Sequence, residues 1–232
     1  TAKGWGFQDV LFKGQALELE RPLGSYVMEH VLFKIAFPAE FHAQTAVECA
    51  LTLHPEVVDR LDDIERIELE TQEAGARIID KTGPLNNYAD RDHCLQYMVA
   101  VPLIFGSLTA DSYTDQTAAD PRIDALREKM VVRENPEFTA AYFDPEQRAI
   151  GNAIQIFFKD GSSTQRVSID FPIGHRRRRA EGIPKLEAKF KDAIEAHFDA
   201  AQAASIEKAM GNRETLETMS VPEFMKMWAV RA

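Results

Sequence analysis

Cysteine is scarce in this sequence, and no hydrophobic run is long. The 232-residue chain holds only Cys49 and Cys94, which could form one bond but not a disulfide framework, so a reducing intracellular compartment is favoured. The longest apolar run, residues 98–105, contains Pro102 and is far shorter than the ~20 residues that span a bilayer, so we expect no membrane segment. No signal peptide is visible at Thr1, and the missing initial Met suggests a fragment or a processed chain.

Basic residues are also few relative to acidic ones. The chain has 27 Lys and Arg against 37 Asp and Glu, a formal net charge of -10. This balance argues against nucleic acid or an anionic membrane surface as the partner, because both attract basic faces. A local basic pocket could still bind an anionic small molecule. The sequence contains no Gly-rich phosphate loop and no Gly-x-Ser-x-Gly elbow, and it shows no metal-ligand spacing, so we predict no metal site.

Hydrophobic periodicity predicts both helices and strands in the first part of the chain. The predicted elements are a helix over 39–53 that ends before Pro55, a half-buried strand over 64–71, a helix over 90–106, and a helix from Pro121 to about Met130. Asp90 is a plausible N-cap for the helix over 90–106, and Pro102 should kink that helix. Pro121 occupies a favoured position for proline at a helix start.

The second part of the chain begins with a predicted β-hairpin over 152–171. Apolar residues alternate on both arms, and Asp160-Gly161 supplies the turn. Three helical patterns come next: one that follows Pro184, one over 200–210 and one over 222–230. The pattern after Pro184 carries an apolar stripe of Leu186, Phe190, Ile194 and Phe198. Strands and helices are mixed without regular βαβ alternation, so the sequence favours the α+β class. The last helices have no strands among them and are expected to pack on something helical.

Lys34 lies in the apolar segment Val31–Pro38. Burying an ammonium group without a partner is costly, so Lys34 is either an edge lysine that reaches water or a cation held in an apolar pocket to bind a carboxylate. His42 follows closely. It is either a group that supports such a site or a polar residue near the start of a helix.

Arg91, His93 and Tyr97 fall at the start of the predicted helix over 90–106. His93 and Tyr97 are four residues apart and would share one helix face. Free N–H groups at the start of a helix favour an anion, and a buried Tyr hydroxyl needs a partner. The group is therefore either an anion site or a capped, buried helix whose Tyr hydroxyl meets a backbone carbonyl.

His175 opens a run of four consecutive arginines, Arg176–Arg179, which is unusual on an acidic chain. Arginine side chains suit carboxylates because their N–H groups form a fork. The run is therefore either a carboxylate-binding feature or a solvated face with ion pairs to nearby Asp and Glu. No basic or aromatic surroundings accompany it, so a nucleic-acid site is poorly supported.

Four segments together resemble the MmgE/PrpD family. They are residues 21–28 (RPLGSYVM), residues 31–42 (VLFKIAFPAEFH), residues 83–102 (GPLNNYADRDHCLQYMVAVP) and residues 174–184 (GHRRRRAEGIP). They span most of the chain in the expected order. The resemblance implies the C-terminal half of an enzyme about twice this length. Residues 1–21 would end a helical domain, residues 22–182 would form an α+β lid, and residues 183–232 would return to the helical domain.

The resemblance also implies an activity. A family member of this type is a lyase that dehydrates 2-methylcitrate to 2-methyl-cis-aconitate in propionate catabolism, with a tricarboxylate substrate, no cofactor and a homodimeric state. It would lie in the bacterial cytoplasm or the fungal mitochondrial matrix. Two cysteines do not supply the three thiolates that an iron–sulfur cluster normally needs. The rival interpretations are a cis-aconitate decarboxylase-like enzyme of the same family and a non-catalytic tricarboxylate-binding or oligomerisation module.

The resemblance assigns roles to individual residues. Lys34 and Tyr97 match lid residues implicated in the related cis-aconitate decarboxylases and are the predicted catalytic pair. The substrate-binding residues are expected to be Arg91, His93, His175 and Arg176. Asp and His residues of the family's helical domain have no counterpart here, so the general base is expected outside this chain.

Overall fold

The computed structural model describes residues 2–16, 18 and 34–229. The chain divides into two units, Thr1–Leu32 and Phe33–Ala232. The first contains helix α1 (Phe7–Leu11), which buries no residue. The segment over 21–28 that carried part of the family resemblance lies outside the described residues. The three-domain scheme therefore stays a prediction.

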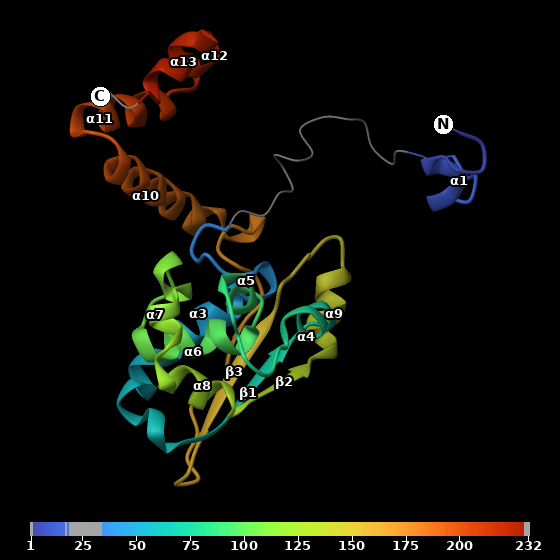
Figure 1. Cartoon of the computed structure of the whole chain (residues 1–232), viewed down its shortest axis with the longest axis vertical. Coiled ribbons are helices and arrows are strands. Elements are labelled where there is room, and N and C mark those ends of the chain that lie inside the picture. The colour runs from blue at the N-terminus through green and yellow to red at the C-terminus, as the bar shows by residue number, and fades with distance from the viewer. Residues whose placement is uncertain (1, 17, 19–33, 230–232) are drawn as a thin grey trace. The chain divides into compact units, whose positions relative to one another are not determined.

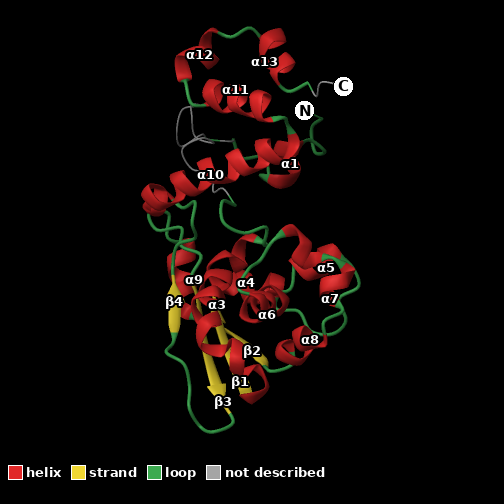
Figure 2. Ribbon diagram, turned by 90° about the vertical axis from the view of Figure 1, so that its left-hand side faces the viewer, coloured by secondary structure: helices red, strands yellow, loops and turns green. Residues whose placement is uncertain are grey.

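A four-stranded mixed sheet forms the centre of the second unit (Figures 1 and 2). Its strands in spatial order are β2 (Met130–Glu134), β1 (Ile64–Thr71), β3 (Asn152–Phe158) and β4 (Val167–Ile169). β1 runs parallel to β2 and antiparallel to β3, and β3 runs antiparallel to β4. Helices and a mixed sheet in one unit confirm the predicted α+β class.

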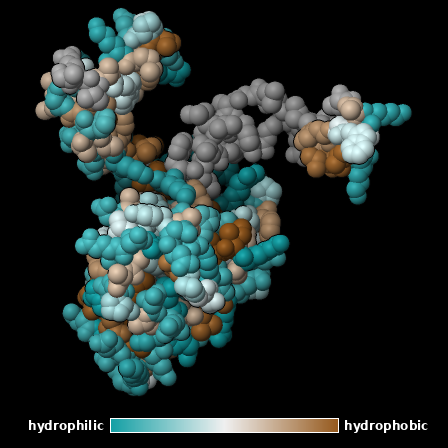
Figure 3. Space-filling view, in the orientation of Figure 1, coloured by the Kyte–Doolittle hydropathy of each residue, from teal (hydrophilic) through white to brown (hydrophobic). Residues whose placement is uncertain are grey.

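Helices lie on both sides of this sheet. Figure 1 shows α3 (Gln44–Val57), α6 (Leu95–Phe105) and α8 (Pro121–Arg127) on one side and α4 (Glu73–Ile79) and α9 (Pro136–Phe143) on the other. α3 packs on β3 and β4, α6 packs on α3, and α8 packs on α6, whereas α4 contacts β2 and α9. On the face of the second unit in view, hydrophilic residues predominate (Figure 3).

The two predicted strand regions are confirmed. β1 has the predicted bounds, and its buried residues Ile67 and Leu69 alternate with partly exposed neighbours. The hairpin pairs β3 with β4, and Asn152 faces Ile169 across the ladder. Gly161 in its turn has a φ of +84°, a conformation that glycine adopts without the steric cost of a side chain.

The predicted helix over 90–106 is wrong as a single element. It consists of α5 (Tyr88–Asp92) and α6, separated at His93 and Cys94. α5 closes with a bond from the His93 N–H to the Ala89 carbonyl, and Cys94 then turns to an extended conformation at φ -126°. The N-cap of α5 is Asn87 rather than Asp90, and the Asn87 side chain accepts the Asp90 N–H. His93 and Tyr97 therefore do not share a helix face.

Other helix ends also differ from the prediction. α3 continues through Pro55 to Val57, and α8 ends at Arg127 before the strand that begins at Met130. The periodicity gave no signal for β2, where only Met130 is buried, or for the short helices α4 and α9. Three further short elements are η1 (Phe41–Ala43), η3 (Ala110–Tyr113) and α7 (Asp115–Ala118).

Four helices end the described chain. After the 3-10 turn η4 (Arg176–Arg178) they are α10 (Arg179–His197), α11 (Ala200–Met210), α12 (Arg213–Thr218) and α13 (Val221–Met227). The helix predicted over 200–210 is confirmed, while α10 starts before Pro184 and includes it. Ile194, Ala203 and Ile206 form a small buried cluster of their own. Among the described residues, no helix is long and apolar enough to cross a membrane.

Helix α6 lies at the centre of the main hydrophobic core. All its residues from Leu95 to Ile104 are buried. Truncating a buried Leu removes apolar contacts and leaves a cavity, which costs about 2–5 kcal/mol. The Leu103→Ala substitution should therefore lower the free energy of unfolding by about that amount in urea denaturation.

Phe105 in the last turn of α6 is the matched control, because it is 42% exposed. Its replacement by Ala should cost less than half as much as Leu103→Ala, at an unchanged denaturant slope. Equal losses for the two variants would contradict the central position of this helix in the core.

Candidate functional site

Two predicted site residues, Arg91 and Tyr97, meet at the same short segment. The Tyr97 hydroxyl donates to the Ser112 carbonyl at 2.6 Å. The Arg91 guanidinium donates to the next carbonyl, that of Tyr113, at 2.6 Å and to the Asp115 carboxylate at 2.7 Å. The rings of Tyr97 and Tyr113 stack with centroids 6.0 Å apart. Arg91 and Tyr97 thus hold η3 and the start of α7 against the buried helix.

Burial governs the chemistry of this group. Burial raises the pKa of Tyr97 to about 12, and the positive charge of Arg91 acts in the opposite direction. The phenol is therefore neutral at physiological pH and serves as a hydrogen-bond donor rather than a ready proton source. The Arg91 side chain is only 5% exposed. Its Nε and the Tyr113 hydroxyl are buried without a hydrogen-bond partner among the described residues.

His93 and Lys34 lie apart from this group. The His93 side chain is exposed, and its Nδ1 lies 3.2 Å from the Ala89 carbonyl. Lys34 is exposed rather than enclosed in an apolar pocket. Its carbonyl accepts a hydrogen bond from the Lys189 ammonium at 2.9 Å, and the following residues, from Ile35 to Pro38, line an open groove of about 830 Å³. The roles predicted for Lys34 and His93 stay predictions.

His175 is buried and fully engaged with the backbone. Its Nε2 lies 3.0 Å from the Gln147 carbonyl, and its Nδ1 accepts the Arg177 N–H at 3.2 Å. This pattern assigns the neutral tautomer with the proton on Nε2. Burial lowers the pKa of His175, and the charges of Arg176 and Arg177 lower it further, against the bond to Gln147. His175 therefore anchors the loop before α10 as a neutral side chain.

The arginine run is divided among several internal partners. Arg176 donates to the Glu146 carbonyl, and Arg177 stacks on the Phe171 ring with its guanidinium carbon 4.7 Å from the centroid. Arg178 binds both carboxylate oxygens of Glu48, at 2.7 and 2.8 Å. The ion-pair interpretation of the run thus describes Arg178, and Arg176 adds a longer ion pair, with its guanidinium 3.9 Å from the Glu146 carboxylate.

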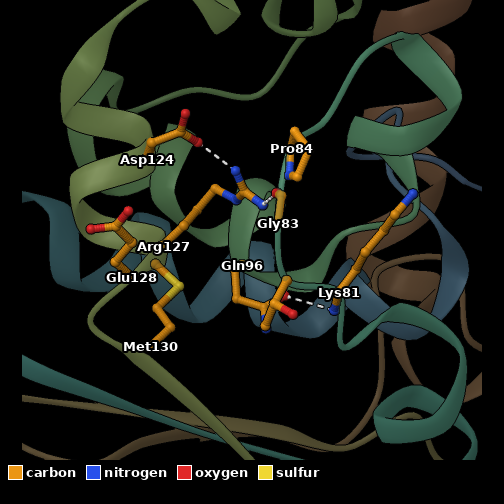
Figure 4. A pocket seen from close by; sticks show the side chains of 9 residues that line it. Lys81, Gly83, Pro84, Gln96, Asp124, Arg127, Glu128 and Met130 are labelled. Atoms are coloured by element: carbon orange, nitrogen blue, oxygen red, sulfur yellow. Dashed lines mark hydrogen bonds and ion pairs between the residues drawn. The ribbon is translucent and has the colours of Figure 1, made fainter.

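Sequence reasoning missed a pocket beside the predicted Gly83–Pro102 stretch (Figure 4). Its volume is about 440 Å³, and Arg127 forms one wall. The Arg127 guanidinium pairs with Asp124 and donates to the Gly83 carbonyl at 2.9 Å. Figure 4 shows the Lys81 ammonium turned away from this arginine. Because Arg127 comes from α8, 44 residues along the chain from Gly83, no local pattern pointed to it.

Metal ligation has no candidate cluster in the part of the chain that the structure describes. Within it, no three His, Cys, Asp or Glu side chains are grouped closely enough to hold a metal ion. Cys49 and Cys94 are both buried and free. Burial raises the pKa of both thiols, which keeps them protonated.

The fold is thus an α+β unit in which an arginine and a tyrosine gather at the start of a buried helix. The chain belongs to the MmgE/PrpD family: the model of the MmgE/PrpD C-terminal domain matches residues 37–214. This match includes every predicted site residue except Lys34, which precedes it.

Curated relatives match along almost the whole chain. 2-Methylcitrate dehydratase of Salmonella typhimurium is 57% identical over 99% of this chain, and that of Escherichia coli is 54% identical over 99%. The mitochondrial 2-methylcitrate dehydratase of Yarrowia lipolytica is 54% identical over 98%. The matches cover 48%, 48% and 44% of those proteins. The chain therefore spans about half the length of these relatives.

The burial of His175 predicts how stability depends on pH. Because its pKa is lowered in the folded state from the ordinary 6.5, the unfolded chain takes up a proton first as the pH falls. The contribution of His175 to stability is therefore complete above pH ~6.5 and is lost below it. Urea denaturation at pH 7, 6 and 5 should show a flatter pH dependence for His175→Gln than for the wild type.

The exposed His197 offers a matched control for this comparison. His197→Gln should keep the wild-type pH dependence. A His175→Gln variant with the same pH dependence as the wild type would contradict the assignment of His175 as a neutral, buried anchor.

Proposed function

We propose that this chain is the C-terminal half of a hydro-lyase that converts 2-methylcitrate to 2-methyl-cis-aconitate. The observation that carries the proposal is the identity of 54–57% along 98–99% of the chain with three relatives named 2-methylcitrate dehydratase. The neutral, buried Tyr97 and the nearby guanidinium of Arg91 support it, since both can donate to carboxylate oxygens.

The reaction defines what the site must provide. A proton leaves the carbon next to a carboxylate, and a hydroxyl leaves the neighbouring carbon as water. This needs a base, an acid and positive charges for three carboxylates. Negative charge grows on the carboxylate beside the reacting carbon, so a cation or donor fixed there lowers the barrier. We propose a metal-independent elimination of this kind.

Lys34 and Tyr97 receive the central roles in this chain. Lys34 would bind a substrate carboxylate, because its exposed side chain is accessible to a ligand. Tyr97 would donate a hydrogen bond to a carboxylate, in exchange for its bond to the Ser112 carbonyl. Its high pKa argues against the role of proton donor to the leaving hydroxyl. The proposed substrate-binding residues remain Arg91, His93, His175 and Arg176. In this structure the side chains of His175 and Arg176 bind the backbone carbonyls of Gln147 and Glu146.

The wider organisation follows from the same proposal. Residues 22–182 would form a lid, and residues 1–21 and 183–232 would belong to a helical domain that supplies the general base. The active protein would be a homodimer acting in propionate catabolism on a small tricarboxylate. Its place would be the bacterial cytoplasm or the fungal mitochondrial matrix, and the name of the Yarrowia relative, which says mitochondrial, supports the second of these.

The primary test is an ultraviolet assay for the new conjugated double bond, with 2-methylcitrate and a chelator present. The full-length protein should turn over, and this chain alone should not. Turnover of cis-aconitate with release of carbon dioxide, in place of 2-methylcitrate dehydration, would favour the decarboxylase alternative. Binding of tricarboxylates without any turnover would favour a non-catalytic module.

Removal of the Lys34 cation should abolish most of this activity. We expect Lys34→Ala in the full-length protein to lower kcat/KM by about 100-fold or more, because a carboxylate loses its charged partner. Its melting temperature should change little, since the side chain is exposed. Lys159→Ala, at an exposed lysine in the hairpin turn, should leave both values unchanged. Near-normal turnover of Lys34→Ala would refute this assignment.

Removal of the Tyr97 hydroxyl separates catalysis from packing. Tyr97→Phe should cost about 0.5–1.5 kcal/mol of stability, the usual net value of one hydrogen bond, and should lower kcat by about tenfold or more. Tyr113→Phe is the control, because its buried hydroxyl has no partner among the described residues. If Tyr97→Phe loses stability while kcat is unchanged, Tyr97 serves only to cap the buried helix.

A further inference from the structure

A carboxylate, an imidazole and a phenol form a hydrogen-bonded chain outside the residues assigned above. Glu40 Oε1 lies 2.9 Å from Nδ1 of His42, and Nε2 of His42 lies 3.4 Å from the Tyr142 hydroxyl. The side chains of Glu40 and His42 are each 14% exposed. Glu40 and His42 lie at η1, whereas Tyr142 comes from α9, 100 residues along the chain from His42. Tertiary structure therefore assembles this group.

The backbone beneath the imidazole is fixed by the sheet. Asn152 at the start of β3 donates through its Nδ2 to the His42 carbonyl and to the Thr45 hydroxyl, both at 2.7 Å. Thr45 in turn donates to the Ile150 carbonyl at 2.6 Å. Asn152 and Thr45 are almost completely buried. Such supporting bonds restrict the position of the ring, as preorganised acid–base groups require.

Buried polar atoms without partners surround this support. Asn152 Oδ1, Thr71 Oγ1 and Gln72 Nε2 are all buried and have no hydrogen-bond partner among the described residues. Thr71 faces Asn152 directly across the β1–β3 ladder. Buried polar atoms are nearly always paired, so unpaired ones at one end of a sheet indicate a place where water or ligand polar groups bind.

The electrostatics suit proton transfer. Burial alone would raise the pKa of Glu40, but the hydrogen bond and charge of His42 lower it below its ordinary value. The Glu40 carboxylate is therefore ionised beside Nδ1 and stabilises a proton there. This leaves Nε2, which makes a long contact of 3.4 Å to the hydroxyl of the half-buried Tyr142, as the nitrogen that could reach a substrate. An ionised acid behind an imidazole is the arrangement that orients histidine in acid–base catalysis.

We propose that His42, oriented by Glu40, is the general acid of the reaction. This inference rests on the proposed dehydration, and it fills the role for which Tyr97 is unsuited. The His42 imidazolium gives its Nε2 proton to the substrate hydroxyl while the carbon–oxygen bond breaks, and water leaves. The proton on the neighbouring carbon passes to a general base of the imidazole or carboxylate class, and its electron pair forms the double bond. His42 ends neutral, with Nδ1–H still donated to Glu40.

A purely structural role is the competing explanation. The Glu40 carboxylate also accepts the backbone N–H of His42 at 2.8 Å and so caps η1. Glu40→Gln keeps an acceptor oxygen for this cap but removes the charge, so it separates the two roles. We expect it to lower kcat by about tenfold with a small change in melting temperature, because the imidazolium loses its ionised partner.

The decisive experiment uses His42→Ala in the full-length protein. Its kcat for 2-methylcitrate should fall by about 100-fold or more, the usual contribution of a general acid, while KM changes by less than about threefold. Added imidazole should restore kcat at least about tenfold in this variant but not in Lys34→Ala, because only the first lacks a proton donor. A structural histidine would show no such rescue.

His54→Gln supplies the matched control. His54 is a half-buried histidine of α3 whose Nδ1 lies 3.0 Å from the Leu103 carbonyl, and its replacement should leave kcat unchanged. If His42→Ala keeps near-normal kcat, or imidazole restores nothing, the acid assignment is refuted. The dehydration itself then still stands, provided that the wild type turns over and Lys34→Ala does not. An inactive wild type refutes both.

Discussion

The burial of α6 from Leu95 to Ile104 is the constraint on which the rest of the fold depends. A helix with apolar residues on every side cannot leave a face to water, so other elements must cover its circumference over these residues. α3 and α8 pack directly on it, and its residues share one core cluster with Ile67 and Leu69 of β1. The helices on this side of the sheet are thus placed by the need to enclose one segment. At its C-terminal end, Gly106 adopts a φ of +66° and closes the helix with a bond to the Pro102 carbonyl.

Burial of this helix also determines where polar chemistry gathers. Tyr97 carries its hydroxyl into the core, and an unpaired buried hydroxyl costs about 1–3 kcal/mol, so a carbonyl must come to meet it. The Ser112 carbonyl does so, and Arg91 binds the next carbonyl of the same turn. The segment that follows α6 is therefore folded back on the start of the helix. Residues available for catalysis here are the same ones that hold the fold together, which is why stability and turnover must be measured together.

Local patterns predicted the elements whose burial alternates within one segment. β1 and the hairpin were found because inward and outward residues follow each other directly. β2 was not predicted from the sequence, because Val131 is exposed and only Met130 of this strand is buried. Its strand geometry comes from pairing with β1. The break at His93 and Cys94 was not predicted, because the change from polar to apolar residues was taken as the start of one helix. In the structure the Asn87 cap begins α5 before Asp90, and α5 ends where the His93 N–H binds the Ala89 carbonyl and Cys94 becomes extended. Propensity within a segment cannot report such competition between two short helices.

Prediction of the site from the sequence is limited more strongly, because the hydrogen-bond partners of the site residues lie far from them in the sequence. His175 was identified by its arginine neighbours, yet its tautomer is fixed by the Gln147 carbonyl, 28 residues away. Glu40 lies two residues from His42 and was visible in the sequence. The Asn152 amide, which binds the backbone carbonyl of His42, lies 110 residues from His42. Sequence can therefore nominate an imidazole, while only the folded chain decides whether it is a neutral anchor or a group poised for proton transfer. The two histidines differ in this respect because both ring nitrogens of His175 meet the backbone, whereas His42 meets a carboxylate and a phenol.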